Sequence, residues 1–413
     1  MDVEILTVGD ELLLGQTIDT NSAYIARKLS EFGLIPRFKS SVGDSVDEIE
    51  IAIKLAIKRA GLVIATGGLG PTDDDNTKKA IVKVFQRRLV LDDKILEDIR
   101  ARYRKRGIEM PTINENQALI PSGSQMFKNT IGSAVGIGII ENNYIFIALP
   151  GVPTEMKMMM DEEIIPFLSN KKLGQPVKII TLKTNGFFES QLAEIIAPEL
   201  KLEPGVKLAY LPSFSGVDLR IVAMGDEQTI ANEQAQKVEA YIEKKIGKHV
   251  YGRNGDTLPS VVGQLLKDKN KTVATAESCT GGQLGEMITS ISGSSSYYLG
   301  GVVAYSNEIK KAQLGVQGET LEKYGAVSAE CVVEMAVGCR KSLKSDYALS
   351  ITGIAGPEGG TKEKPVGTTF IGLSSAHNVF ARHFNFGVER EMVRSRACYA
   401  ALELLRREIL EIK

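Results

Sequence analysis

The residue types needed for acyl transfer occur together in the last third of the chain. The stretch SGSSSYYLGGVVAYSNEIK has Ser295 at the centre of a serine run and ends at Lys310. A serine hydroxyl becomes a nucleophile when a neighbouring base takes its proton. Histidine is the usual base, but none of the three histidines lies in a segment that looks like a site: His249, His377 and His383. A serine–histidine hydrolase is therefore disfavoured, and a serine–lysine pair stays open.

Two further polar stretches flank that pair in the sequence. AESCTGG supplies Ser278, Thr280 and Gly281, and ITGIAGP supplies Thr352 and Gly353. Read alone, AESCTGG fits an ordinary helix cap as well as it fits a phosphate-binding turn. Together, these hydroxyl-rich and glycine-rich turns are more numerous than packing requires. We expect them to converge on a pocket for a small polar molecule.

A second group of residues, near the N-terminus, points to phosphate and cation chemistry. In TGGLGPTDDDNT, the glycines Gly67, Gly68 and Gly70 would let backbone N–H groups approach a phosphate, and Thr77 would begin a helix whose positive end adds to the anion site. Nearby carboxylates would repel a phosphate unless a divalent cation lay between them. The acidic residues expected to bind such an ion are Asp10, Glu11, Asp74 and Asp75. A capped acidic turn is the plainer alternative.

Alternating strands and helices must position both groups. Short β-branched runs at 3–8, 62–66 and 144–149 are separated by helical patterns, one of which repeats apolar residues at Ile49, Ile53 and Ile57. This alternation predicts an α/β fold with a mainly parallel sheet that is covered on both faces. Ligands of such sheets bind at the carboxyl ends of the strands, where the glycine-rich and acidic stretches fall.

Two polar segments divide the chain into three predicted domains. SNKKLGQP near residue 170 and YGRNGDTLP at 251–259 have the composition of turns and linkers. The sequence therefore predicts a multi-domain protein. An α/β domain is expected at 1–168, a small α+β linking domain at 169–252, and a second α/β domain at 253–413.

Charge and cysteine usage exclude several classes of protein. The 413 residues include 50 basic and 51 acidic side chains, a formal net charge of -1, so we expect neither direct nucleic-acid binding nor membrane attachment. The four cysteines show no CxxC spacing, which argues against a disulfide framework and a structural zinc site. The acidic N-terminus also differs from a signal peptide. A cytoplasmic location is predicted.

The N-terminal residues resemble the molybdopterin-binding family. The hallmark of that family is a TGGxG loop followed by Asp and Thr, with an acidic turn after the first strand; here Thr66 to Gly70, Asp75 and Thr77 match. The stretches NTIGSAVG and ALPGVPTEM look like its remaining loops. Asp74 stands where many of those proteins have Arg, and the extra acid favours cation-assisted chemistry.

AESCTGG, SGSSSYY, AYSNEIK, TGIAGP and GVER together resemble the C-terminal domain of the CinA family (competence/damage-inducible protein A). The resemblance covers essentially the whole chain. It implies that the C-terminal domain hydrolyses the carboxamide of nicotinamide mononucleotide to nicotinate mononucleotide and ammonia without a metal. It also implies that the N-terminal domain hydrolyses ADP-ribose to AMP and ribose 5-phosphate with a divalent metal (Mg, Co or Mn), and that the protein is a homodimer.

The resemblance also assigns roles by position. It places the nucleophile at Ser295 and the base at Lys310, with Tyr305 and Arg390 as further catalytic residues. Ser278 and Thr352 match other polar residues of the family's pocket, and Thr280 with the following helix start is expected to bind the substrate phosphate. Lysine has an ordinary pKa of about 10.4, so Lys310 must be enclosed to act as a neutral base.

Two other kinds of function stay open. The historical name of the family suggests a non-enzymatic partner in DNA uptake or recombination, which a salt-dependent DNA shift would reveal. The acidic loop could instead hold a pterin phosphate in a molybdopterin-handling protein.

Overall fold

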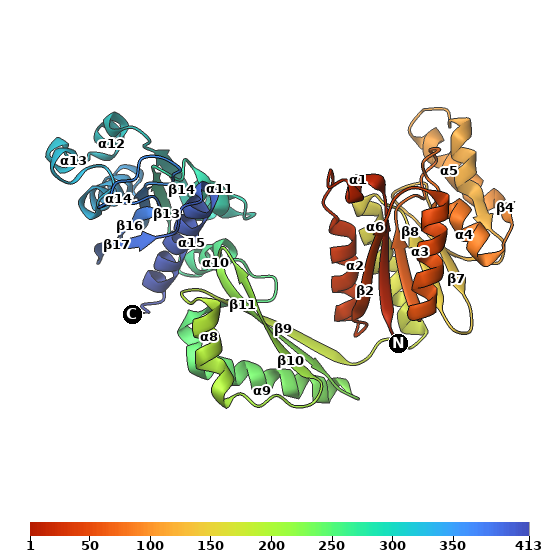
Figure 1. Ribbon diagram of the computed structural model, residues 1–413. Helices are drawn as coiled ribbons and strands as arrows, with labels where there is room; N and C mark the ends of the chain where they lie inside the picture. The colour runs from red at the N-terminus through yellow and green to blue at the C-terminus, as the bar shows by residue number, and fades with distance from the viewer. Residues whose placement is uncertain (413) are drawn as a thin grey trace. The chain divides into compact units, whose positions relative to one another are not determined.

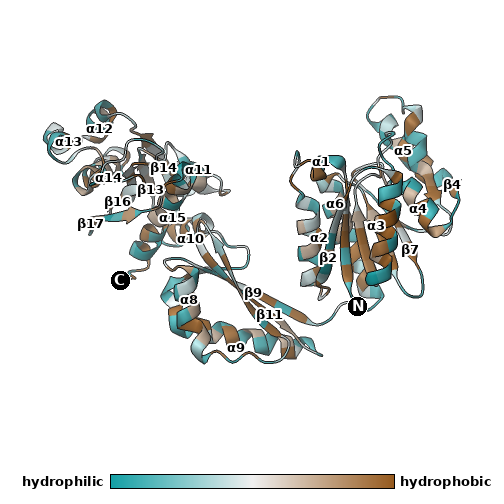
Figure 2. Cartoon of the chain, in the orientation of Figure 1, coloured by the Kyte–Doolittle hydropathy of each residue, from teal (hydrophilic) through white to brown (hydrophobic). Residues whose placement is uncertain are grey.

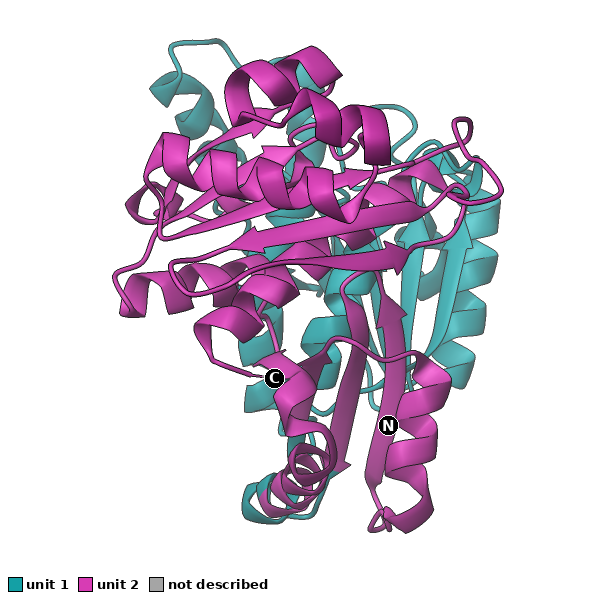
Figure 3. Ribbon diagram, turned by 90° about the vertical axis from the view of Figure 1, so that its left-hand side faces the viewer, with its two compact units in different colours: residues 1–178, 224–232 teal, residues 179–223, 233–413 magenta. Residues whose placement is uncertain are grey.

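The computed structural model describes residues 1–412 and contains two compact units, coloured teal and magenta in Figure 3. The first unit comprises Met1–Lys178 and Met224–Asn232, and the second comprises the other described residues. Among residues 1–412, no helix combines the length and the apolar composition that crossing a bilayer would require.

The first unit is built on a six-stranded sheet with strand order β2-β1-β3-β8-β7-β6, in which β1, β2, β3 and β8 are parallel (Figure 1). The remaining two strands pair antiparallel at one edge. Its elements are β1 (Val3–Val8), α1 (Asp10–Leu13), α2 (Thr20–Glu31), β2 (Pro36–Val42), α3 (Val46–Arg59), β3 (Leu62–Thr66), α4 (Thr77–Phe85), β4 (Leu89–Leu91), α5 (Asp93–Lys105), η1 (Thr112–Ala118), β5 (Leu119–Pro121), β6 (Gln125–Phe127), β7 (Gly136–Ile140), β8 (Ile145–Leu149), α6 (Pro153–Met159), η2 (Met160–Ile164) and α7 (Ile165–Asn170).

Apolar periodicity explains how the helices cover this sheet. In α3, Ile49 and Ile53 are fully buried against the sheet residues Leu6 and Val63, as the spacing predicts. Helices α2 and α6 bury Ile25 and other apolar residues on the opposite face. Figure 2 shows hydrophobic and hydrophilic residues mixed along helices such as α3 and α9 (Gln228–Ile246), as expected of helices with one buried side. The predicted α/β architecture is confirmed.

A small α+β module follows, built on a four-stranded sheet of order β10-β11-β9-β12. Its elements follow the order strand, helix, strand, strand and helix, and β12 adds a further strand, so the expected α+β character of this segment is observed. Its elements are β9 (Val177–Thr184), α8 (Glu189–Ile196), η3 (Ala197–Glu199), β10 (Val206–Ser213), β11 (Gly216–Met224), α9 (Gln228–Ile246), η4 (Gly247–His249) and β12 (Val250–Arg253).

The C-terminal part of the second unit has a five-stranded sheet of order β14-β13-β15-β16-β17. β13, β14 and β15 are parallel, and the last two strands are antiparallel. Apolar residues of α10, α11 and α15 share one core with the sheet, and those of α14 share another. Its elements are α10 (Leu258–Asp268), β13 (Val273–Glu277), α11 (Gln283–Thr289), η5 (Ser294–Ser296), β14 (Tyr298–Val303), α12 (Asn307–Leu314), α13 (Gly318–Tyr324), α14 (Ala329–Leu343), β15 (Tyr347–Gly353), β16 (Thr368–Ser374), β17 (Val379–Asn385) and α15 (Arg390–Ile409).

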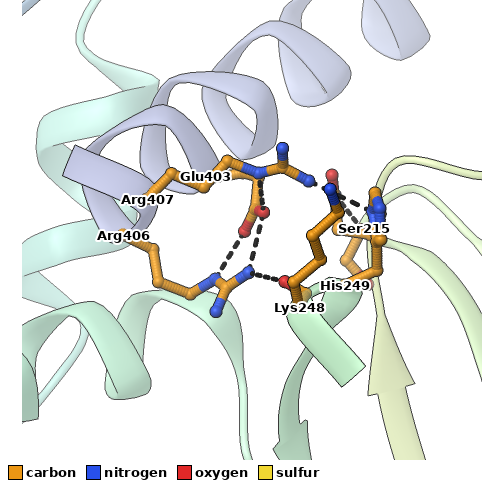
Figure 4. A network of polar contacts seen from close by, with 7 residues as sticks. Ser215, Lys248, His249, Glu403, Arg406 and Arg407 are labelled. Carbon is orange, nitrogen blue, oxygen red and sulfur yellow. Dashed lines mark hydrogen bonds and ion pairs between the residues drawn. The ribbon is translucent and has the colours of Figure 1, made fainter. Parts of the chain in front are cut away.

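A buried polar network joins α15 to the α+β module within the second unit (Figure 4). The Arg406 guanidinium donates twice to the Glu403 carboxylate, at 2.7 and 2.9 Å, and Arg407 Nε donates to it at 2.8 Å. Arg406 also donates to the Lys248 carbonyl at 2.8 Å, and Arg407 Nη2 lies 3.1 Å from His249 Nδ1. The last turns of α15 are thereby tied to η4.

Candidate active site in the C-terminal sheet

A buried lysine occupies the centre of the candidate site. Lys310, in the first turns of α12, is 1% exposed. Its Nζ donates to Ser278 Oγ at 3.0 Å, to the Ala304 carbonyl at 2.8 Å and to the Tyr305 carbonyl at 3.2 Å. All three acceptors are uncharged, and no carboxylate within residues 1–412 is hydrogen-bonded to this amine. Burial lowers the pKa of Lys310 from its ordinary 10.5.

The ends of three parallel strands bring these groups together. Ser278 directly follows β13 and donates its N–H to the Ile351 carbonyl of β15 at 3.0 Å. Ala304 directly follows β14 and donates its N–H to the Glu277 carbonyl at 2.7 Å. The chain then turns at Ser306, whose side chain accepts a hydrogen bond from the Ile309 N–H and so caps α12. The cap fixes the start of α12, which contains Lys310, next to the strand ends. The site therefore lies at the carboxyl edge of the sheet, as the fold predicts.

The prediction that Ser295 meets Lys310 is wrong. Ser295 is exposed in η5, which precedes the amino end of β14, whereas the carbonyls that bind Lys310 follow the carboxyl end of β14. A strand of six residues spans about 20 Å, so the two residues lie at opposite ends of it. The structure pairs Lys310 with Ser278 instead.

The other predicted residues lie near the carboxyl edge of the C-terminal sheet, but their side chains do not contact the Lys310 amine through any hydrogen bond within residues 1–412. The Tyr305 side chain is 63% exposed, while its carbonyl binds Lys310. The Thr352 hydroxyl is buried and donates to the Ala326 carbonyl at 2.8 Å, and Gly353 ends β15. Arg390 is exposed at the start of α15 and donates to the Gly356 carbonyl at 2.8 Å.

An open cleft of about 650 Å³ adjoins the loop that contains Ser278. It is lined by Gly281, Gly282, Gln283, Glu286, Arg390, Glu391 and Arg394. Arg394 donates to the Thr280 carbonyl at 2.7 Å, and among residues 1–412 neither cleft arginine forms an ion pair with a carboxylate. Two guanidinium groups one helical turn apart, without acidic partners, suit the binding of an anion such as a phosphate.

The predicted phosphate site at the start of α11 is already filled by a protein carboxylate. Glu277 is 2% exposed, and it accepts from the N–H groups of Gly282 at 3.0 Å, Leu284 at 3.0 Å and Gly285 at 2.8 Å. These are the donors that an anion would need. The Thr280 side chain is fully buried. The sequence reasoning missed Glu277, although an acid that ends the apolar run VATAE was a visible signal.

A thiol lies directly beside the serine. Cys279 is 7% exposed, and its burial raises the pKa of the thiol to about 11. Within the described residues, the backbone N–H groups of Cys279 and Thr280 donate to no carbonyl and to no side chain of another residue, although the Cys279 N–H interacts with its own thiol. The loop after β13 thus presents a hydroxyl and two backbone donors without a partner in another residue.

The glycine-rich loop of the first unit holds itself in place. Gly67 donates its N–H to the Leu149 carbonyl at 3.1 Å, and the Thr77 hydroxyl donates to the Gly67 carbonyl at 2.8 Å. Gly70 donates its N–H to Asp75 Oδ1 at 2.7 Å. Two of the three glycine N–H groups expected to face a phosphate are therefore used within the protein. The N–H of Gly68 has no partner among residues 1–412.

The four acids predicted to bind one metal ion do not form a ligand set. Both oxygens of Asp75 accept hydrogen bonds from Gly70 and Thr72 of its own loop. Asp10 accepts from the Asp44 N–H at 3.2 Å, and Glu11 and Asp74 are exposed. Across residues 1–412, no three His, Cys, Asp or Glu side chains are placed to hold an ion. The loop uses Asp75 for its own closure.

Replacing Gly67 by alanine tests whether this loop can accommodate a side chain at that position. Gly67 has φ +112°, and an added Cβ would meet the Val8 carbonyl oxygen. We expect Gly67→Ala to lower the free energy of unfolding of the first unit by about 3 kcal/mol or more. Gly107→Ala is the control, because Gly107 has φ +70° with open space around it, and it should cost about 1 kcal/mol. Denaturant unfolding would measure both, and equal effects would contradict the steric explanation.

Comparisons with known proteins match three consecutive stretches of the chain to family models. Residues 4–170 match the family described as probable molybdopterin binding domain, residues 180–252 match the damage-inducible protein CinA KH domain, and residues 255–409 match the CinA C-terminal domain.

Whole-length relatives are also found. A CinA-like protein of Cytophaga hutchinsonii is 44% identical over 414 residues, which cover 99% of this chain and 98% of that protein. A putative competence-damage inducible protein of Caldicellulosiruptor saccharolyticus is 38% identical over 99% of this chain and all of that protein.

A solved structure matches part of the chain. The crystal structure of competence/damage inducible protein CihA from Agrobacterium tumefaciens matches 36% of this chain and 92% of that chain, at 37% identity and a TM-score of 0.36.

Proposed function

Because the chain belongs to the CinA family over its whole length, we propose that its C-terminal domain is an amidohydrolase that acts on nicotinamide mononucleotide. The products are nicotinate mononucleotide and ammonia. The observation that supports this most strongly is the 3.0 Å hydrogen bond between Lys310 Nζ and Ser278 Oγ at the carboxyl edge of the sheet. The substrate is the one that the family resemblance implies, and the two cleft arginines suit its phosphate.

The contacts of Lys310 explain how this amine would act as a base. A neutral lysine amine has two N–H donors and one lone pair. In that neutral form, the carbonyls of Ala304 and Tyr305 can accept both N–H donors, so the lone pair is free to accept the hydroxyl proton across the 3.0 Å contact with Ser278 Oγ. Burial favours this uncharged form, since it lowers the pKa of Lys310. The amine is thus oriented to accept the serine proton.

The reaction then follows the general scheme of acyl transfer. Ser278 Oγ attacks the carboxamide carbon and its proton passes to Lys310. The tetrahedral intermediate collapses, the C–N bond breaks, and Lys310 returns the proton to the leaving ammonia. A water molecule then gives a proton to Lys310 while its oxygen attacks the acyl carbon. The bond between that carbon and Ser278 Oγ breaks, Lys310 returns the proton to Oγ, and nicotinate mononucleotide leaves. The unused N–H groups of Cys279 and Thr280 are available to the oxyanion, where one donor contributes about 3 to 4 kcal/mol in other enzymes.

The direct test is ammonia release by the purified protein from nicotinamide mononucleotide, compared with free nicotinamide. The proposal requires turnover of the nucleotide and much weaker turnover of nicotinamide, which lacks the phosphate. Ammonia release from neither compound would rule the proposal out.

The pH dependence provides a sharper test of the base. Only the neutral form of Lys310 accepts a proton, so we expect kcat/KM for nicotinamide mononucleotide to rise with pH and then level off. The midpoint should lie below 10.5, because burial lowers the pKa of Lys310. A stopped assay from about pH 6 to about pH 10 would measure it. A rate that stays flat or falls over that range would contradict Lys310 as the base.

Hydrolysis of ADP-ribose by the first unit is a second proposal. Its support is the family resemblance and the glycine-rich loop with one unused N–H at Gly68. The acids of this loop do not fit a metal site made of protein groups alone. Incubation with ADP-ribose and Mg²⁺, Mn²⁺ or Co²⁺, with chromatographic detection of AMP, would test it.

A further inference from the structure

Glu277 is a charged side chain in the interior that the proposed mechanism does not use. It ends β13, directly before Ser278, and is 2% exposed. A buried carboxylate is costly unless hydrogen bonds or opposite charges compensate it. Among residues 1–412, no lysine or arginine forms an ion pair with Glu277, so backbone groups must provide the compensation.

Three backbone N–H groups provide it, all from Gly282 and the first turn of α11. Oε2 accepts from Gly282 and Leu284, and Oε1 accepts from Gly285. These donors would otherwise be unsatisfied at the start of the helix, and the helix dipole favours a negative charge there. The carboxylate is therefore matched in both hydrogen bonding and charge.

These bonds close a loop around the reacting serine. The segment 278–281 leaves β13 at Glu277 and returns to the carboxylate of the same residue at Gly282. Inside the loop, the Gly281 N–H donates to the Ser278 carbonyl at 3.1 Å, and Gly281 and Gly282 have φ of +62° and +98°. The unused N–H groups of Cys279 and Thr280 belong to this same segment. One side chain thus fixes the backbone that bears the hydroxyl and both donors.

We infer that Glu277 is a positioning residue for acyl transfer at Ser278, an inference that rests on the proposed function. Its carboxylate holds the loop 278–281 in the conformation that presents the hydroxyl and the two N–H groups together. Glu277 itself touches no reacting atom. It also neutralises the positive end of α11, so the substrate phosphate is left to the arginines of the cleft.

Glu277→Gln is the appropriate substitution because the amide keeps the shape of the side chain but has one acceptor oxygen. Its NH₂ group cannot accept, so at least one of the three N–H groups loses its partner. We expect kcat for nicotinamide mononucleotide to fall about 30-fold or more, as misplaced donors weaken transition-state binding. KM should change less than about threefold, because the cleft arginines are on α15.

A second readout does not depend on nicotinamide mononucleotide. Phenylmethanesulfonyl fluoride sulfonylates reactive serines: the Oγ–S bond forms, the S–F bond breaks, fluoride leaves and the base takes the proton. Mass spectrometry of the wild type should locate the label on Ser278, and Glu277→Gln should react about tenfold or more slowly. Glu277→Asp keeps the charge but shortens the side chain by one CH₂, so its sulfonylation at Ser278 should also be slow. Wild-type reactivity of Glu277→Asp would mean that the negative charge, and not the position of the carboxylate, determines the reactivity of Ser278.

Ile288→Val is the matched control for stability. Ile288 is buried in α11, and its apolar side chain cannot hydrogen-bond to the carboxylate, so the variant should lose about 1 kcal/mol of stability and keep wild-type kcat. Wild-type labelling and turnover in Glu277→Gln would overturn the inference and leave the proposed function intact. If the wild type is labelled at Ser278 but does not release ammonia, the substrate proposal fails, and slow labelling of Glu277→Gln still supports the inference. No label on wild-type Ser278 would overturn both.

Discussion

Ser278→Ala and Lys310→Met should each reduce ammonia release from nicotinamide mononucleotide by about 10³-fold or more. The first removes the one side-chain oxygen within residues 1–412 that is hydrogen-bonded to the buried amine, and the second removes the amine while keeping its apolar stem. Members of a nucleophile–base pair act as a unit, so the double variant should lose little more than either single one. Steady-state assays of the three variants would measure this.

Ser295→Ala is the decisive comparison. Ser295 is exposed at the opposite end of β14, and its variant should keep activity within about twofold of the wild type. A large loss in Ser295→Ala together with an active Ser278→Ala would reverse our assignment of the nucleophile. Circular dichroism of all variants would verify that they are folded.

Glu403→Ala should have the largest effect on stability. The carboxylate is buried between the guanidinium groups of Arg406 and Arg407 and accepts three hydrogen bonds from them (Figure 4). Removing it leaves two neighbouring cations, one of them buried, without a counter-ion. We expect the free energy of unfolding of the second unit to fall by about 3 to 5 kcal/mol, as measured by denaturant titration.

An exposed ion pair provides the control for that measurement. Glu199 pairs with Lys245 at 2.7 Å, and its side chain is largely exposed. Glu199→Ala should change the free energy of unfolding by less than about 1 kcal/mol. If Glu403→Ala were equally mild, the buried network would not be a main tie between α15 and η4.

The secondary structure could be predicted because it depends on local periodicity. The positions of Ile49 and Ile53 in α3 and the β-branched runs of β1 and β3 follow directly from the pattern of burial. The enclosure of Lys310 was also correctly expected, since a lysine base must be uncharged. These features need no knowledge of which distant segments meet.

The partner of Lys310 could not be identified in this way, because it depends on strand order. Ser295 is close to Lys310 in the sequence, yet β14 separates them, while Ser278 comes from the neighbouring strand β13. The partners of Asp75 could not be predicted from the sequence either. An acidic residue in a glycine-rich turn has the same composition whether it binds a cation or its own backbone, and here it binds the backbone.

The burial of Cys279 has a consequence for the chemical resistance of the site. Because burial raises the pKa of its thiol to about 11, the thiolate form is scarce at neutral pH. Peroxide and alkylating agents attack the thiolate, so the sulfur atom next to the proposed nucleophile Ser278 should react with them slowly. A hydroxyl nucleophile in this position would keep working under oxidising conditions that inactivate cysteine-dependent amidases.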